Sequence, residues 1–384
     1  MLKLNIVKTL SMEISEHQLS RKGKKSVVIA GGGTGGHIYP GIAIAKAIQS
    51  RDPEVEVHFV GAKGGLEEKI VPKEGFPLHL VPIGKLHSSV GKWQQFKTLL
   101  GLPFAFLKSI FLLFKLRPQA LLGVGGFASG PILFVGSLFK FRTFVWEPNA
   151  VPGLANRLLS RFVDQCLVVF KDASKHLKST NIVQSGLPVR PSMKPSSRPK
   201  TNERSPLRIL VFGGSQGAHA INDVLCRLLI SKPDWLNKVE IVHQTGTRDF
   251  QEIQDAYKVL PGNVEVFEYL HDMDKRFEWA DLIICRAGAS TVAEICACQK
   301  AAVFIPLPTA ADNHQQKNAE VLVQGNAADM ILQKNLSEVL LEETILKYVN
   351  RPQLVTELEG RVEEFHFPDA ADRISSRLLG ETNE

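Results

Sequence analysis

The chain carries the same kind of glycine-rich turn twice. Residues 27–37 read VVIAGGGTGGH, and residues 209–219 read ILVFGGSQGAH. In each case a short apolar run predicts a buried strand, the glycines predict a sharp turn, and a helical pattern follows. The free N–H groups and the positive dipole end of that helix favour an anion at the turn. Two such units predict two facing nucleotide-binding folds, with phosphate chemistry in the cleft between them.

Length and composition set broad limits on the function. The 384 residues suffice for two α/β domains, and a hydrophobic content of 44% lets each bury its own core. A net charge of +7 indicates an acidic partner, such as anionic lipid or a phosphorylated substrate. No nucleic-acid-binding motif occurs, so no nucleic acid is expected among the partners. The five cysteines form no CxxC pair, which indicates a reducing compartment and argues against a disulfide scaffold or a zinc site.

Strand and helix patterns alternate through both halves, which predicts an α/β protein with two Rossmann-like parallel sheets. The expected division is an N-terminal extension at 1–25, a first domain at 26–190, a linker at 191–206, a second domain at 207–365, and a last helix at 366–384 that packs back on the first domain. The extension has no uninterrupted apolar core and does not read as a secretory signal. Strands are expected at 27–30, 55–60, 120–124 and 143–146, and then at 207–212, 239–244, 264–267, 282–285 and 302–306.

One segment of the first domain, residues 93–116, is strongly apolar and is flanked or interrupted by lysines. A membrane-spanning helix needs about 20 mostly apolar residues, and Pro103 and Lys108 argue against a span. Two alternatives remain open. The segment is a helix that lies on an anionic membrane surface, which its many phenylalanines favour, or it is a buried helix of the first domain.

The first turn, Gly31-x-Gly33-x-x-Gly36, satisfies the dinucleotide fingerprint, which is a weak signal by itself. A dinucleotide site also needs an acid at the end of the second strand to hold a ribose, and that strand ends in Gly61-Ala62-Lys63. Neither turn is followed by the Lys-Ser/Thr of a P-loop. Nicotinamide and flavin cofactors are therefore not expected.

Several polar side chains follow the predicted strands, where ligands bind in parallel α/β folds. His37 lies at a helix start whose positive end keeps an imidazole neutral, so it could take a proton from a sugar hydroxyl or only bind a phosphate. Glu294 could accept hydrogen bonds from the two hydroxyls of a ribose, and the amide-rich loop at 306–318 suits a hexose. Asp272-Met273-Asp274 has the letters of a metal-binding motif but begins a predicted helix, so N-capping is favoured and no metal is expected.

Six motifs occur in a fixed order along the chain: GGGTGGH, GVGGFASGP, WEPNAVPG, GGSQGAHAIN, CRAGASTVAE and ADNHQQKNA. Together they resemble the MurG-type N-acetylglucosaminyltransferases of peptidoglycan synthesis, from about Ser26 to the last helix. The resemblance implies a GT-B fold, in which two Rossmann-like domains face each other across a cleft. It also implies an inverting transfer of GlcNAc from UDP-GlcNAc to the 4-hydroxyl of MurNAc in undecaprenyl-diphosphate-MurNAc-pentapeptide (lipid I), which gives lipid II. No metal and no cofactor is implied.

The resemblance also implies a place in the cell. We expect a peripheral protein on the cytoplasmic face of the inner membrane, in contact with an anionic membrane surface. Other cell-wall synthesis or division proteins are expected as neighbours there.

By the same resemblance, particular residues receive roles. His37 and Glu147 are the candidate bases, Arg190 and Ser215 lie near the donor diphosphate, and the backbone of Leu270 reads uracil. The other expected substrate-binding residues are Thr34, Gly35 and Gly36 of the first turn, Asn149, the helix positions Ala289, Ser290, Thr291, Val292, Ala293 and Glu294 with Glu294 on the ribose, and Gln315 and Gln316 on the GlcNAc hydroxyls.

The motifs depart from the family pattern at three places. The usual HEQN reads Trp146-Glu147-Pro148-Asn149, the tyrosine of GGYVSGP is Phe127, and the usual NPVR reads LPVR at 187–190. We expect activity to be retained, with altered handling of the acceptor. Three other functions remain as alternatives: another UDP-sugar transferase of the GT-B type, a UDP-GlcNAc epimerase on the same fold, and a non-catalytic sugar-nucleotide sensor.

Overall fold

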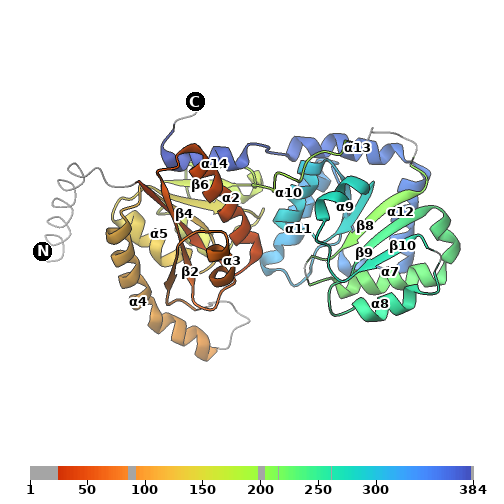
Figure 1. The fold of residues 1–384 in the computed structure, drawn as a ribbon, viewed down its shortest axis with the longest axis horizontal. Coiled ribbons are helices and arrows are strands. Elements are labelled where there is room, and N and C mark those ends of the chain that lie inside the picture. Colours follow the sequence, from red (N-terminus) through yellow and green to blue (C-terminus); the bar gives the residue numbers. More distant parts are fainter. Residues whose placement is uncertain (1–24, 85–91, 198–203, 215, 261, 382–384) are drawn as a thin grey trace, which may run out of the picture.

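The computed structural model describes residues 25–84, 92–197, 204–214, 216–260 and 262–381. Within these residues each half of the chain forms one parallel sheet. Figure 1 shows the two resulting domains side by side along the long axis of the molecule. The predicted fold class, α/β with two Rossmann-like domains, is confirmed. The expected extension at 1–25 lies outside the described residues, apart from Lys25.

The first sheet is covered by helices on both faces. Its strands are β1 (Ser26–Gly31), β2 (Glu56–Ala62), β3 (Leu78–Val81), β4 (Ala120–Gly125), β5 (Thr143–Glu147), β6 (Gln165–Val168) and β7 (Ile182–Gln184), in the order β3-β2-β1-β4-β5-β6-β7. Its helices are α2 (Gly35–Arg51), α3 (Glu67–Lys73), α4 (Lys92–Leu116), α5 (Ser129–Leu138) and α6 (Leu154–Leu159). One face packs on Ile42 of α2, and the other packs on Leu113 of α4 and Leu133 of α5. Because both faces are covered, β1, β4 and β5 are buried throughout.

The second sheet repeats this arrangement. Its strands are β8 (Leu207–Phe212), β9 (Val239–Gln244), β10 (Val264–Phe267), β11 (Leu282–Cys285), β12 (Ala301–Phe304) and β13 (Asp329–Met330), in the order β10-β9-β8-β11-β12-β13. Its helices are α7 (His219–Ser231), α8 (Phe250–Tyr257), α9 (Met273–Trp279), α10 (Ala289–Cys298), α11 (His314–Gln324), α12 (Glu338–Asn350) and α13 (Gln353–Val362). Leu225 of α7 and Ile345 of α12 pack on one face, and Ile295 of α10 and Leu322 of α11 pack on the other.

Every strand that the apolar runs predicted is present, with its ends within two residues of the expected ones. The sequence did not predict β3, β6, β7 and β13. These strands have two to four residues, and β3 and β7 are largely half-buried at the two edges of the first sheet. A short edge strand has no long apolar run to mark it, because one side of its backbone faces no further strand.

The chain crosses back to the first domain at its end. Helix α14 (Ala370–Leu379) lies against α2, and Figure 1 shows α13 and α14 in line along one edge of the molecule. Ile374 and Leu378 are fully buried in the first core. Arg51 at the end of α2 forms ion pairs with Asp372 (3.2 Å) and Glu381 (2.8 Å).

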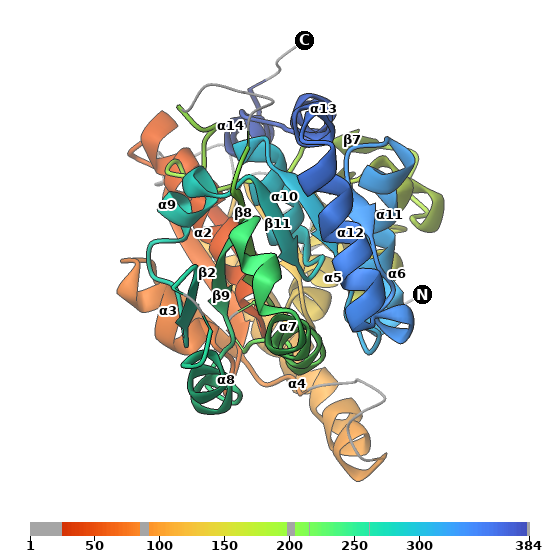
Figure 2. The ribbon, with the colours of Figure 1, turned by 90° about the vertical axis from the view of Figure 1, so that its right-hand side faces the viewer.

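Helix α4 projects from the body of the first domain, as Figures 1 and 2 show. One side of the helix packs on the sheet, where Ala105 and Leu113 are fully buried. The other side exposes Phe104, Leu107 and Phe111, each by more than 60% of its surface. The buried-helix prediction is therefore right for one side of α4, and an apolar surface remains on the other. Among the described helices, none combines the length and apolar character that crossing a membrane requires.

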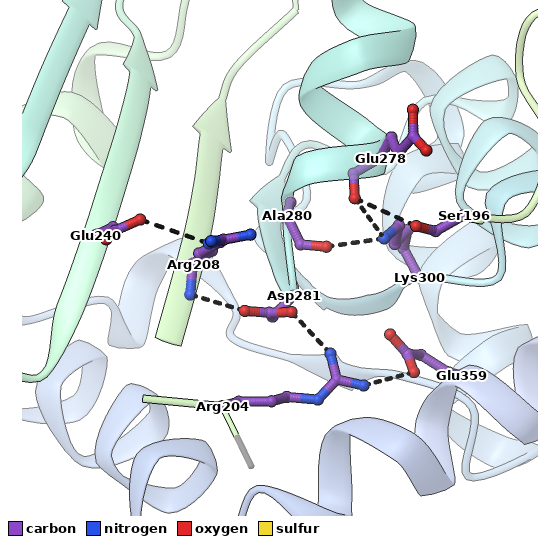
Figure 3. A network of polar contacts seen from close by, with 9 residues as sticks. All are labelled: Ser196, Arg204, Arg208, Glu240, Glu278, Ala280, Asp281, Lys300 and Glu359. Atoms are coloured by element: carbon purple, nitrogen blue, oxygen red, sulfur yellow. Dashed lines mark hydrogen bonds and ion pairs between the residues drawn. The ribbon is translucent and has the colours of Figure 1, made fainter. Parts of the chain in front are cut away.

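The end of the linker is fixed to the second domain by a buried ionic network, drawn in Figure 3. The Arg204 guanidinium donates to Asp281 Oδ1 and to Glu359 Oε2, both at 2.8 Å, and all three side chains are almost fully buried. Asp281 Oδ2 also accepts the backbone N–H of Arg208 (3.1 Å). Buried carboxylates are tolerated only when they are paired, so Arg204 is required by both of its neighbours.

We predict that Arg204→Met destabilises the second domain by about 3 kcal/mol, because it leaves two buried carboxylates without their guanidinium partner. The control is Arg208→Met, which breaks only a partly exposed pair with Glu240 at 3.5 Å and should cost less than about 1 kcal/mol. Urea unfolding followed by tryptophan fluorescence measures both free energies. Equal losses in the two variants would contradict this account of the linker.

Candidate active site

Three of the residues predicted to bind the substrates, Asn149, Arg190 and Glu294, lie where the two domains meet. Polar contacts join the domains there, among them Arg157 to Asp312 at 2.8 Å, Arg190 to Glu294 at 3.1 Å, and the Ala150 N–H to Asn318 Oδ1 at 2.8 Å. All three come from segments that follow strands of the parallel sheets, where α/β folds bind ligands.

His37 lies in the first turn of α2, at the carboxyl end of β1. Its Nδ1 lies 3.2 Å from the hydroxyl of Thr34, the N-cap residue. Its ring lies against Gly125 of β4, where an added Cβ would be 2.9 Å from Nε2. Burial lowers the pKa of His37, and His314 of the facing domain lowers it further, against opposing effects of the Gly32 backbone and Glu67. The imidazole is therefore neutral near pH 7 and able to accept a proton.

Glu147, the second candidate base, is almost fully buried at the end of β5. Its Oε1 accepts the backbone N–H (2.9 Å) and the side-chain amide (3.2 Å) of Asn149. Its Oε2 accepts the N–H of Gly153 (3.0 Å) and the amide of Asn156 (2.8 Å). Burial raises the pKa of Glu147, while these four hydrogen bonds favour the ionised form. The carboxylate thus faces the loop that follows β5 and holds it in shape.

Asn318 of α11 connects that loop to the second domain. It is fully buried, and its Oδ1 accepts the N–H of Ala150 (2.8 Å). Its Nδ2 donates to Asn149 Oδ1 and to the carbonyl of Ala287, each at 3.2 Å. One amide side chain therefore satisfies buried polar groups of both domains.

Glu294 and Arg190 are brought together across the domain boundary. Burial raises the pKa of Glu294, and Arg190 opposes that shift. Helix α10 begins at Ala289, with Gly288 as its N-cap residue in extended conformation, so its first N–H groups and positive dipole end point toward the same region. Ser290, Thr291 and Ala293 are half-buried, whereas Val292 is buried in the core.

Three other predicted residues, Leu270, Gln315 and Gln316, make hydrogen bonds within the second domain. The carbonyl oxygen of Gln315 accepts the N–H of Leu307 (3.0 Å), and the amide of Gln316 donates to Glu320 (2.8 Å). The N–H of Leu270 donates to Gln244 Oε1 (3.2 Å), and Gln244 in turn donates to the carbonyl of Gly214 in the second glycine turn (2.9 Å). Gly35 and Gly36 form the start of α2. Ser215 lies outside the described residues.

Three residues of this region escaped the sequence analysis: Glu67, Asn318 and Gln244. Asn318 was inside the quoted ADNHQQKNA motif, and its polar position in an otherwise apolar helix face was a usable signal. Gln244 ends an apolar strand, at the edge where ligands bind. Glu67 follows β2 by five residues and gave no local signal, since its partners lie in a different turn.

No group of three or more His, Cys, Asp or Glu side chains is arranged to hold a metal in the part of the chain that the structure describes. Asp272 takes the N-cap position of α9, as predicted. Its carboxylate makes no capping hydrogen bond and instead pairs with Arg276 at 3.4 Å.

Comparison with protein families assigns both domains. Residues 27–168 match the glycosyltransferase family 28 N-terminal domain, and residues 208–374 match the C-terminal domain of the same family. The UDP-N-acetylglucosamine--N-acetylmuramyl-(pentapeptide) pyrophosphoryl-undecaprenol N-acetylglucosamine transferase of Bdellovibrio bacteriovorus is 49% identical over 93% of this chain and 99% of its own length. The enzyme of the same name from an Anaeromyxobacter species is 41% identical over 91% of each chain.

The chain belongs to the MurG-type transferases of glycosyltransferase family 28. The crystal structure of Acinetobacter baumannii MurG superposes with a TM-score of 0.78 at 28% identity, over 93% of this chain and 99% of that one. The GT-B fold that the motifs predicted is thereby confirmed. A UDP-GlcNAc 2-epimerase of Neisseria meningitidis shares the fold, with a TM-score of 0.62 at 10% identity. That likeness is limited to the fold.

In this MurG-type transferase, two residues that differ from the family motifs, Trp146 and Phe127, pack against other side chains or backbone. Trp146, at the histidine position of HEQN, is fully buried and donates from Nε1 to the carbonyl of Gly186 (3.2 Å). Phe127, at the tyrosine position, lines an apolar cavity of about 220 Å³ together with Phe106 and Phe134. Trp146 therefore combines apolar packing with one hydrogen bond to the backbone, and Phe127 contributes apolar packing alone.

We predict that Asn318→Ala destabilises the interface between the two domains of this transferase and so lowers its urea midpoint. The Ala150 N–H and the Ala287 carbonyl lose a buried partner, which should cost about 1–3 kcal/mol. The control is Lys317→Ala, which removes only a half-exposed ion pair with Glu320 on the same helix. Urea midpoints measure both effects, and an unchanged midpoint in Asn318→Ala would contradict the role given to this amide.

Proposed function

We propose that this chain transfers GlcNAc from UDP-GlcNAc to the 4-hydroxyl of MurNAc in lipid I, with inversion at the anomeric carbon, and so forms lipid II for peptidoglycan. It is a UDP-GlcNAc-dependent glycosyltransferase of the MurG type. The observation that carries the proposal is the neutral, half-buried imidazole of His37, which a helix start directs to the junction of two glycosyltransferase domains.

His37 is the general base of the proposed mechanism. The acceptor hydroxyl attacks the anomeric carbon from the face opposite UDP and passes its proton to the imidazole. For Nε2 to take the proton, Nδ1 must carry the ring hydrogen and donate it to Thr34 Oγ1, which lies 3.2 Å away. A base in this position contributes roughly 10²–10⁴-fold to the rate.

Glu147 has a positioning role in this mechanism. All of its hydrogen-bonding capacity is directed to Asn149, Gly153 and Asn156, so no lone pair is left to take a proton from a substrate without breaking one of these bonds. Asn149 then presents a fixed amide at the acceptor side of the domain junction.

The donor binds to the second domain. Glu294 accepts the ribose hydroxyls, the backbone of Leu270 reads uracil, and Gln315 and Gln316 contact GlcNAc. Arg190, which pairs with Glu294 in the structure, turns to the diphosphate when the ribose takes over the carboxylate. Arg190, Ser215 and the helix N-termini then stabilise the charge that builds on UDP as it leaves. No metal takes part in this mechanism.

The membrane contact is made by the exposed side of α4 and its neighbours. Phe104, Leu107 and Phe111 of α4 are exposed. On the same helix Phe106 packs edge to face on Phe134 at 5.8 Å, and Phe134 meets Phe162 in the same way at 5.2 Å. The exposed residues Lys108, Lys115 and Arg117 on and beside α4 add positive charge. Apolar side chains among cations fit the surface of an anionic membrane, on the cytoplasmic face of the inner membrane.

Mass spectrometry of purified protein with UDP-GlcNAc and a short-chain lipid I analogue tests the function. A GlcNAc–MurNAc product with release of UDP supports it. UDP-GlcNAc binding without a product would contradict the acceptor assignment. Formation of the 2-epimer of the donor sugar would instead favour the epimerase alternative.

We predict that kcat/KM stays level through neutral pH and falls only below pH 6.5. The base must be neutral, and its pKa is lowered by burial, so the activity is lost only as the pH falls through that lowered value. His37→Gln should lower kcat by roughly 10²–10⁴-fold. A pH–rate profile of the wild type with an acid limb above pH 7, or a fully active His37→Gln variant, would contradict the assignment.

We predict that Phe104→Glu with Phe111→Glu lowers binding to vesicles of anionic phospholipid by at least about tenfold, because two apolar anchors become charged. Val339→Glu is the matched control, since Val339 is equally exposed on α12 of the other domain and should have no effect. Co-sedimentation measures both, and UDP affinity should be unchanged in all variants. Equal vesicle binding by the double variant and the wild type would rule out this surface.

A further inference from the structure

Glu67 turns its side chain from the start of α3 back under the first glycine turn. The residue is only 2% exposed. Its Oε2 accepts the N–H of Gly33 at 2.8 Å, and its Oε1 accepts the N–H of Ala62, at the end of β2, at 3.0 Å. Hydrogen bonds from N–H groups to a carboxylate are stronger than those between neutral groups. One oxygen therefore binds the glycine turn, and the other binds the end of the neighbouring strand β2.

Three glycines leave the space that this carboxylate fills. A Cβ at Gly32, Gly61 or Gly65 would lie 2.2–2.5 Å from side-chain atoms of Glu67. Any other residue at these positions would force the carboxylate away. These glycines, in the first turn, at the end of β2 and in the loop that follows it, thus leave the space that the Glu67 carboxylate needs.

The Glu67 carboxylate binds an N–H group of the glycine turn, and turns of this kind use such N–H groups to bind a phosphate. In dinucleotide-binding folds the N–H groups of the turn approach a pyrophosphate, and an acid after the second strand binds a ribose. Here the acid that follows β2 is Glu67, and it binds the turn itself through Gly33. In the second turn, the carbonyl of Gly214 accepts hydrogen bonds from the side-chain amide of Gln244 and from the N–H of Gly217. Among the described residues, these two bonds of Gly214 involve no carboxylate.

The glycine turn that Glu67 binds leads directly into α2, the helix that carries His37. Gly33 has a left-handed φ of +87°, Thr34 follows it as the N-cap residue of α2, and its hydroxyl touches His37. We propose that Glu67 is a positioning residue that occupies the anion position of the first glycine turn, aims His37 at the acceptor, and keeps the donor diphosphate for the second turn. The aim at the acceptor rests on the proposed function, whereas the occupied turn does not.

The occupied turn can be tested in the wild-type protein without any substrate. Gly33 is exposed to solvent, yet its N–H is bound to Glu67, so its amide hydrogen should exchange at least about 100-fold more slowly than an unprotected amide. Hydrogen exchange read by NMR on labelled protein measures this rate. Exchange of Gly33 at the unprotected rate would overturn the proposal.

Glu67→Gln tests the positioning role, because it keeps the size of the side chain but turns an NH2 group toward one of the two N–H donors. We expect kcat to fall at least about tenfold, with KM for UDP-GlcNAc and UDP affinity changed less than about twofold, and faster exchange at Gly33. The control is Glu68→Gln, on the same turn of α3, whose Oε1 accepts only the N–H of Gly64 (2.8 Å). Glu68→Gln should have the kcat, the KM for UDP-GlcNAc and the Gly33 exchange rate of the wild type.

An unchanged kcat in Glu67→Gln, or an equal fall in Glu68→Gln, would overturn the positioning role. If Glu67→Gln does not fold, Gly65→Ala replaces it, since the added methyl displaces the carboxylate and keeps its charge. The same fall in kcat is then expected, and wild-type kcat would overturn the role. If the wild type itself forms no lipid II, the proposed function fails, and the exchange of Gly33 still decides whether the turn is occupied.

Discussion

Buried carboxylates that accept backbone N–H groups shape two turns of the first domain of this enzyme. Glu147 holds the loop after β5 through Asn149, Gly153 and Asn156, and Glu67 holds the first glycine turn through Gly33. Neither carboxylate is free to solvent, and each satisfies several donors that would be costly to bury alone. Removing either one would leave both a hole and unpaired N–H groups, so the backbone around His37 and Asn149 depends on them.

The two domains of this MurG-type chain are similar in fold but differ in what their glycine turns offer. In the first domain the turn is engaged by an internal carboxylate and leads to a neutral imidazole. In the second domain α10 begins at Ala289, and its Glu294 is half-buried and pairs with Arg190 of the first domain. Asn318 joins the two halves through one buried amide. In the proposed mechanism the first domain therefore supplies the base and the second domain binds the nucleotide.

The sequence predicted the two parallel sheets because buried strands such as 207–212 and 282–285 are apolar on both faces. It could not predict β13, which has two residues, or which side of the 93–116 helix would be covered, because both sides are apolar. The motifs singled out His37, Glu147 and Glu294, and the structure has Glu147 at the end of β5, His37 in the first turn of α2 and Glu294 in α10. They could not show that both oxygens of Glu147 accept hydrogen bonds from the loop that follows it. Nor could they show that Asn318 bonds to Ala150, which lies 168 positions away in the chain. Contacts of that kind depend on how the domains dock, and no local pattern records them.

The most direct test of the account is a crystal structure of the protein with UDP and a short-chain lipid I analogue. We predict the 4-hydroxyl of MurNAc within hydrogen-bonding distance of His37 Nε2, the ribose on Glu294, and Glu147 still bound to Asn149 and Gly153. A complex in which the Glu147 carboxylate has left its loop and contacts the attacking hydroxyl, with His37 turned away, would contradict the account.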